Sequence, residues 1–233
     1  MGYSLNRLAM SGLKLLRDTR LILLSLTLAG CATTSTFTLI EPQRVMVADV
    51  ISVEPGINWN KVSTSKYTGN IEVWTLDGPT LNTMMFFTGV PNGEPLFMRR
   101  GENQGAVEPP PVFKSDMNPF EIQELLEATM ARNFQTTIAD SRGLRPQLID
   151  DGRGFRFDTS LVGRDEVERH GVFVGTIRND KLYGAWFQGA RHHYFYRYLD
   201  EYDRIIESAQ LVGEASEKTG EGIRAEDDGA ASD

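Results

Sequence analysis

The chain has 233 residues, of which 40% are hydrophobic and 24% are charged, and its formal net charge is −8 at neutral pH. This length is enough for one domain with a hydrophobic core. The acidic balance argues against nucleic-acid binding, because affinity for phosphates comes from lysine and arginine. Cys31 is the only cysteine, which excludes an internal disulfide and a site built on several cysteine ligands.

The first 30 residues are typical of a secretory signal peptide. Four basic residues and one acidic residue precede an apolar run of about ten residues, roughly half the length of a membrane-spanning helix. The alternatives are a signal peptide without lipid attachment and a short core helix. Residues 28–31 are Leu-Ala-Gly-Cys and resemble the lipobox of bacterial lipoproteins. The resemblance implies cleavage between Gly30 and Cys31 and attachment of a diacylglycerol to the cysteine sulfur.

This leader predicts where the mature protein works. Removal of residues 1–30 takes away a surplus of three positive charges and leaves a net charge near −11. Acyl chains on Cys31 would anchor the mature protein to a membrane without crossing it. Ala32 follows the cysteine in place of the aspartate that holds many lipoproteins at the inner membrane. The resemblance therefore implies the periplasmic face of the outer membrane. Met10 is an alternative start that gives the same mature protein.

Three segments follow the signal peptide. Residues 31–36 are predicted to be the lipidated cysteine and a short polar tether, and residues 37–212 are predicted to form one folded domain. Residues 213–233 contain seven acidic and two basic residues and no aromatic residue. This composition buries too little surface to fold, so we expect a disordered acidic tail.

The first half of the domain is predicted to be rich in strands. Residues 44–53 and 71–76 have the β-branched and aromatic side chains of strands. Residues 81–90 favour a further strand, with a helix as the alternative. Residues 91–117 include three consecutive prolines and are predicted to be a long loop.

The second half combines helices and strands. Asn118, followed by Pro119 and Glu121, is a helix-start pattern, and apolar residues at helical spacing continue to Phe134. Residues 155–161 alternate between apolar and polar side chains, as a half-buried strand does. The remaining predicted elements are a strand at 171–177, a tight turn at 178–181, a strand at 182–189 and a closing helix at 195–209.

This order predicts an α+β fold in which an antiparallel sheet packs against helices. The element order, with Ile-Ile-Glu-Ser-Ala-Gln-Leu at residues 205–211, resembles the PsbP-like fold, an α/β/α sandwich, over about residues 40–212. Plant members of that family assist a membrane complex through protein contacts, and bacterial lipoproteins with this fold exist. The resemblance implies an accessory role and carries over no active-site residue.

The sequence holds no common catalytic signature. His192 and His193 are adjacent, so their side chains point apart on either a strand or a helix. No metal site and no cofactor are therefore predicted. His192 with Asp158 is the least weak pair for a catalytic role.

Aromatic residues are the other candidates for binding. The candidate binding residues are Trp59, Trp74, Trp186 and His192. The tryptophans are included because their side chain combines an apolar body with a hydrogen-bond donor. The alternative is that the tryptophans fill the core. Trp59 is expected to be partly exposed, because it follows a turn and has polar neighbours.

Three functions stay open at this stage. The leading prediction is an envelope accessory protein that holds a protein partner with its sheet face or with residues 91–117. The second is a carrier of a small apolar or lipid-like ligand, in a cavity lined by Met84, Phe86, Phe155 or Trp186. The third is a hydrolase that acts on cell-envelope material. The oligomeric state is not predicted.

Overall fold

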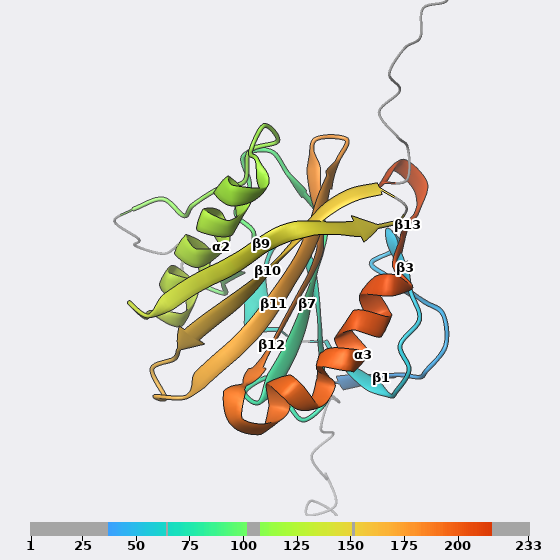
Figure 1. Cartoon of the computed structure of the whole chain (residues 1–233), viewed down its shortest axis with the longest axis horizontal. Coiled ribbons are helices and arrows are strands. Elements are labelled where there is room, and N and C mark those ends of the chain that lie inside the picture. The colour runs from blue at the N-terminus through green and yellow to red at the C-terminus, as the bar shows by residue number, and fades with distance from the viewer. Residues whose placement is uncertain (1–36, 64, 102–107, 151, 216–233) are drawn as a thin grey trace, which may run out of the picture. The chain divides into compact units, whose positions relative to one another are not determined.

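The computed structural model describes residues 37–63, 65–101, 108–150 and 152–215. The predicted signal peptide, tether and most of the acidic tail lie outside these residues. Eight strands form one antiparallel sheet (Figure 1), in the order β1-β4-β6-β7-β12-β11-β10-β9. Their bounds are β1 Phe37–Ile40, β4 Trp59–Val62, β6 Ile71–Thr75, β7 Asn82–Pro91, β12 Lys181–Ala190, β11 Glu168–Arg178, β10 Gly152–Val162 and β9 Ala139–Ile149.

Short elements complete the described part of the domain. A three-stranded sheet has the order β13-β3-β2, and β5 pairs with β8. The helices and the remaining strands are β2 Val45–Val47, β3 Ile51–Val53, β5 Tyr67–Thr68, β8 Met98–Arg99, α2 Pro119–Phe134, the π-helical turn η1 Arg191–Phe195, α3 Tyr196–Glu207, β13 Gln210–Leu211 and the 3-10 turn η2 Gly213–Ala215.

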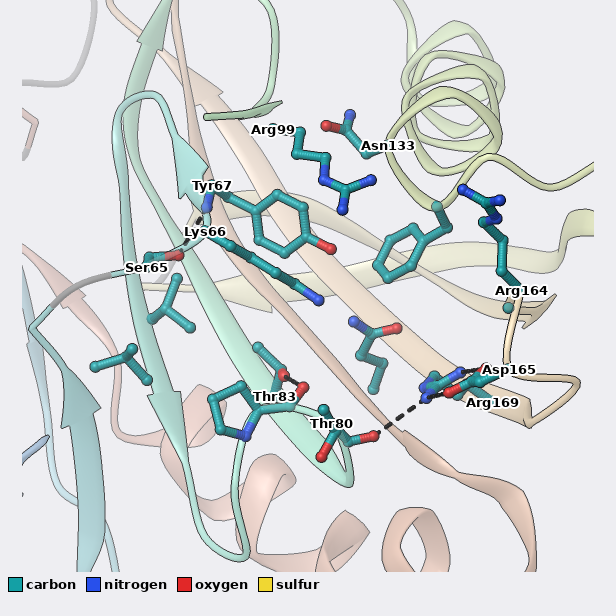
Figure 2. Close-up of a pocket in the computed structure, with 16 residues that line it drawn as sticks. Ser65, Lys66, Tyr67, Thr80, Thr83, Arg99, Asn133, Arg164, Asp165 and Arg169 are labelled. Carbon is teal, nitrogen blue, oxygen red and sulfur yellow. Dashed lines mark hydrogen bonds and ion pairs between the residues drawn. The ribbon is translucent and has the colours of Figure 1, made fainter. Parts of the chain in front are cut away.

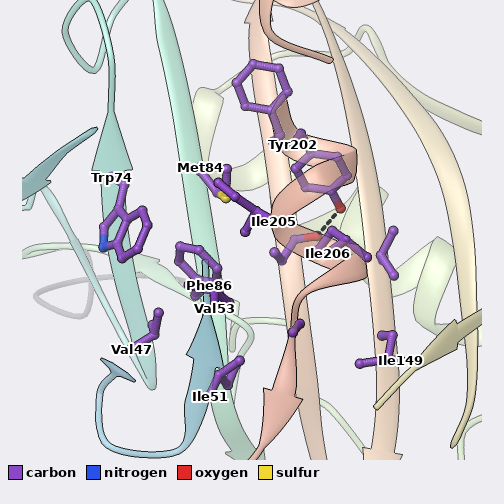
Figure 3. Close-up of a cluster of buried hydrophobic side chains, with 14 of the residues drawn as sticks. Val47, Ile51, Val53, Trp74, Met84, Phe86, Ile149, Tyr202, Ile205 and Ile206 are labelled. Carbon is purple, nitrogen blue, oxygen red and sulfur yellow. Dashed lines mark hydrogen bonds between the residues drawn. The ribbon is translucent and has the colours of Figure 1, made fainter. Parts of the chain in front are cut away.

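The large sheet buries both of its faces. Phe86 and Phe87 are neighbours on β7, and because side chains alternate along a strand they enter two different cores. Phe86 belongs to the core that includes Tyr202 of α3 (Figure 3), and Phe87 belongs to the core that includes Leu126 of α2. The two helices therefore cover opposite faces of the sheet. The α+β prediction, with its α/β/α layering, is confirmed.

Burial on both faces explains the strand at residues 81–90. A strand that is covered on both sides has a continuous apolar sequence instead of an alternating one. The segment from Met84 to Phe87 is buried throughout. This is why the sequence alone left a helix as the alternative.

Several segments differ from the sequence prediction, which also lacks the short strands β1, β4 and β5. Residues 91–117 are more than a loop, because they include β8 and the buried side chains of Leu96 and Phe113. The edge strand β9 is absent from the prediction. Its side chains are mostly exposed, and it carries Pro146 and a left-handed Gly143 beside a register shift. Such features protect a sheet edge from pairing with another chain, and they also hide the strand from pattern analysis.

The start of α2 has the predicted capping box. The Asn118 side chain accepts hydrogen bonds from the backbone of Phe120 and Glu121, and the Glu121 carboxylate accepts one from the Asn118 backbone. We expect Asn118→Ala to reduce the free energy of unfolding by about 1 kcal/mol. For a chain of this size, that lowers Tm by about 2–4 °C in a thermal melt followed by circular dichroism. Asn118→Asp keeps the acceptor and is the control, and an equal loss in both variants would contradict the capping role.

Candidate anion-binding pocket

The tryptophans are core residues. Trp59 is 0% exposed, so the predicted partial exposure of this side chain is wrong. The reason is α3, whose Glu201 carboxylate accepts hydrogen bonds from the Trp59 indole at 3.3 Å and from the Gly56 backbone at 2.7 Å. The turn before Trp59 is therefore tied down onto the helix, and the ring is covered.

Trp74 and Trp186 are equally enclosed. The Trp74 indole donates to Glu72, and the Trp186 indole donates to Thr159 at 3.0 Å. Met84, Phe86 and Trp186 are at most 1% exposed, and none of them lines a hollow described below. These three residues therefore fill the two cores and do not form the cavity that the carrier hypothesis required.

The fourth residue of that hypothesis lies elsewhere. Phe155 borders a surface hollow of about 520 Å³ between the start of α2 and the β9–β10 hairpin. Its other apolar lining residues include Pro119, Leu144 and Leu148. This hollow is open to the surface, and Phe155 itself belongs to the core on the α2 side.

His192 is exposed on η1 and lines a shallow surface hollow with Glu166, Glu168 and Arg191. Asp158 does not line that hollow and pairs instead with Arg145 at 3.3 Å. The structure therefore does not bring the proposed catalytic pair together in one site. Among the described residues, no group of three or more histidine, cysteine or acidic side chains could hold a metal ion.

A more distinctive pocket lies beyond the C-terminal end of α2 (Figure 2). It has a volume of about 420 Å³, within the range typical of small-molecule sites. Its floor is the large sheet, through Thr83 of β7 and Gln188 of β12. Its walls are the end of α2, the β5–β8 pair, the turn before β7 and the turn between β10 and β11.

Two buried side-chain oxygens in the pocket lining have no hydrogen-bond partner among the described residues. They are Asn133 Oδ1 and Gln188 Oε1, on residues that are 4% and 6% exposed. The amide nitrogen of Asn133 donates to the carbonyls of Phe97 and Thr129, which fixes the orientation of the amide. An unpaired buried acceptor costs about 1–3 kcal/mol. Neither oxygen is accessible to solvent, so both lie behind the pocket surface and do not face a ligand in it.

The pocket is positively charged although the chain is acidic. Lys66, Arg99, Arg164 and Arg169 line it together with a single carboxylate, Asp165. Figure 2 shows the Lys66 amine and the Tyr67 hydroxyl directed into the same space. Among the described residues, no carboxylate forms an ion pair with Lys66 or Arg164. Positive charge gathered in a concave site is the electrostatic arrangement that attracts an anion.

The pocket changes the pKa of two of its own groups. Desolvation lowers the pKa of Lys66 from 10.5, and the charges of Arg99 and Arg169 lower it further. Desolvation raises the pKa of Tyr67 to about 12. The Lys66 amine lies 5.2 Å from the centre of the Tyr67 ring. At neutral pH the Tyr67 phenol is neutral and can donate a hydrogen bond to a ligand.

Local contacts hold two of the guanidinium groups. Arg164 donates to the side chain of Gln135, the left-handed residue that ends α2. Arg169 pairs with Asp165 at 2.6 Å and donates to the Thr80 carbonyl. The hydrogen bond from Arg169 is the main reason why the pKa of Asp165 falls to about 2. These contacts place both cations at the pocket before any ligand arrives.

Comparisons with known proteins give distant structural neighbours. The chain is similar to the cyanobacterial PsbP protein of Synechocystis sp. PCC 6803, with 11% identity and a TM-score of 0.46 over 80% of this chain and 99% of that one. It is also similar to LpqN of Mycobacterium tuberculosis, described as involved in cell envelope biogenesis, with 8% identity and a TM-score of 0.32 over 78% and 88% of the two chains. No family model matches the sequence, and no curated protein does.

The first of these neighbours belongs to the family that the element order resembles. At TM-scores below 0.5, the fold class rests on the architecture of this chain and not on the neighbours. No helix among the described residues has the length and apolar character needed to cross a membrane.

Proposed function

We propose that this chain is a lipid-anchored protein of the cell envelope that binds a small organic anion in the pocket formed by Lys66, Tyr67, Asn133, Arg169 and Gln188. The ligand class is an organic phosphate or carboxylate. The proposed anchor is a lipid on Cys31, at the outer membrane and facing the periplasm, and it rests on the leader sequence.

One observation carries the ligand assignment. Four cations and a single carboxylate line one pocket of about 420 Å³. The cations select an anion, because guanidinium and ammonium groups form charge-assisted hydrogen bonds with phosphate and carboxylate oxygens. A purely apolar ligand would desolvate these charges without adding a counter-charge.

The other functions have less support from the described residues. The apolar carrier needed a cavity lined by Met84, Phe86, Phe155 or Trp186. Met84, Phe86 and Trp186 are packed, and Phe155 borders a hollow that is open to the surface. The hydrolase needed convergent polar groups with shifted pKa values in one cleft, and its least weak candidates, His192 and Asp158, do not share a site. The envelope protein partner stays a prediction, and a small-ligand pocket is compatible with it.

The test is calorimetric titration of the full-length protein in detergent. The probes are glycerol 3-phosphate, glycerophosphoglycerol and galacturonate, with glycerol as the neutral control. We expect at least one anion to bind saturably and glycerol not to bind. The affinity should fall as salt is added, because the interaction is electrostatic. If no anion binds more tightly than glycerol, the proposed function is wrong.

The proposal also predicts a pH dependence. Because the folded-state pKa of Lys66 lies below 10.5, its amine loses its proton earlier than an ordinary lysine as the pH rises. The pocket then loses one positive charge, while Tyr67, with a pKa of about 12, stays neutral. We expect the affinity for glycerophosphoglycerol, whose phosphodiester does not titrate in this range, to fall as the pH rises through the pKa of Lys66. Calorimetry at a series of pH values measures this, and Lys66→Met should remove the dependence.

A further inference from the structure

We infer that the anion in this pocket is the phosphate headgroup of an anionic glycerophospholipid, presented by the membrane that carries the anchor. The inference rests on the proposed function and names the source of its ligand. It is carried by the position of strand β1 beside the pocket, by two exposed apolar side chains on that strand and by the distribution of charge.

Strand β1 is the edge of the large sheet next to the pocket. It pairs only with β4 in that sheet, and its first residue, Phe37, lies opposite Val62. Val62 lines the pocket and packs against the core on the α2 side. The first described residue of the chain is thus one strand away from the pocket wall.

The exposed side of β1 is apolar. Residues directly opposite each other in an antiparallel pair point to the same face, so Phe37 shares the face of Val62. Leu39 is two residues further along and is on that face as well. Phe37 is 41% exposed and Leu39 is 56% exposed. The apolar wall of the pocket therefore continues into an exposed apolar edge.

Chain length keeps this edge close to the proposed anchor. Six residues lead from Cys31 to Phe37, and a fully extended chain covers at most about 3.5 Å per residue. A lipid on Cys31 therefore holds Phe37 within about 20 Å of the attachment point. No other ligand source is held within reach by the chain itself.

Charge then sets which surface faces the lipids. The mature chain carries a net charge near −11, so an anionic membrane repels the protein as a whole. The pocket gathers Lys66, Arg99, Arg164 and Arg169 around Asp165 and is the attracted part. The apolar edge of β1 would contact the boundary of the acyl chains, and the cationic pocket would contact the layer of lipid phosphates.

The experiment uses full-length lipidated protein with one added cysteine. Leu39→Cys carries a polarity-sensitive fluorophore in one sample, and Leu148→Cys carries it in the control. Leu148 is 69% exposed and lies on β9, the opposite edge of the sheet. Each protein is reconstituted into phosphatidylcholine vesicles with or without phosphatidylglycerol. Calorimetry with soluble glycerophosphoglycerol in detergent runs in parallel.

We expect the emission of the label at position 39 to shift to the blue only when phosphatidylglycerol is present. The shift should be lost in Lys66→Met and at high salt, and the label at position 148 should not respond. If soluble glycerophosphoglycerol binds but position 39 does not respond, the ligand is a free anion. The inference then fails while the proposed function stands. If neither binds, both fail. An equal response at positions 39 and 148 would also overturn the inferred orientation.

Discussion

Replacement of Lys66 by methionine should weaken anion binding by about 10–100-fold, because a hydrogen bond to a charged group contributes about 1.5–3 kcal/mol. Methionine keeps an unbranched side chain that is one heavy atom shorter, and it removes the charge and the N–H donors. The Lys66 amine lies in the pocket with Tyr67, and desolvation already lowers its pKa. The folded protein therefore does not stabilise the charged form of Lys66 relative to the unfolded chain. We expect the melting temperature of Lys66→Met to be no lower than that of the parent.

A matched lysine separates the pocket from general charge effects. Lys114 is also exposed, and it does not line the pocket. Lys114→Met changes the net charge by the same amount and should leave the affinity within about twofold, since an exposed charge outside the pocket is screened by salt. Calorimetry with glycerophosphoglycerol measures both variants. Equal affinities for Lys66→Met and the parent would remove Lys66 from the site.

The fold was predictable where local pattern and final environment agree. Helix α2 has its capping residue Asn118 and an apolar stripe, so its start and its buried face are both encoded locally. Strand β10 alternates because only one set of its side chains is deeply buried. Strand β9 was missed because it lies at the sheet edge, where few side chains are buried and the apolar period is lost.

The pocket could not be predicted from the sequence. Its cations come from separate segments, and none of Lys66, Arg99 or Arg169 stands in a motif. The unpaired state of Asn133 Oδ1 depends on carbonyls of Phe97 and Thr129 that take up the amide nitrogen. Such a site exists only after the sheet, the β5–β8 pair and α2 have come together. The sequence signal that was available, an acidic overall charge, pointed away from an anion site.

Trp59 gives the opposite case, in which local sequence suggested a surface and tertiary packing made a core. We expect Trp59→Ala to reduce the free energy of unfolding by about 3–5 kcal/mol, the usual cost of removing a buried tryptophan. For a chain of this size, such a loss lowers Tm by about 6–20 °C. The ring lies 6.2 Å from Trp74 and 6.4 Å from Phe187, so its removal leaves a cavity in the core beneath α3.

The size of this loss decides between the two roles of Trp59. A partly exposed binding residue would cost little when truncated, because surface substitutions usually change stability by about 0.5 kcal/mol or less. Phe120→Ala is the control, since Phe120 is an aromatic residue that is 56% exposed. Chemical denaturation of both variants gives the comparison. If Trp59→Ala and Phe120→Ala lose equally little stability, the ring is not part of the core. A large loss for Trp59→Ala with unchanged anion affinity would place the tryptophan in the scaffold and leave binding to the pocket at Lys66.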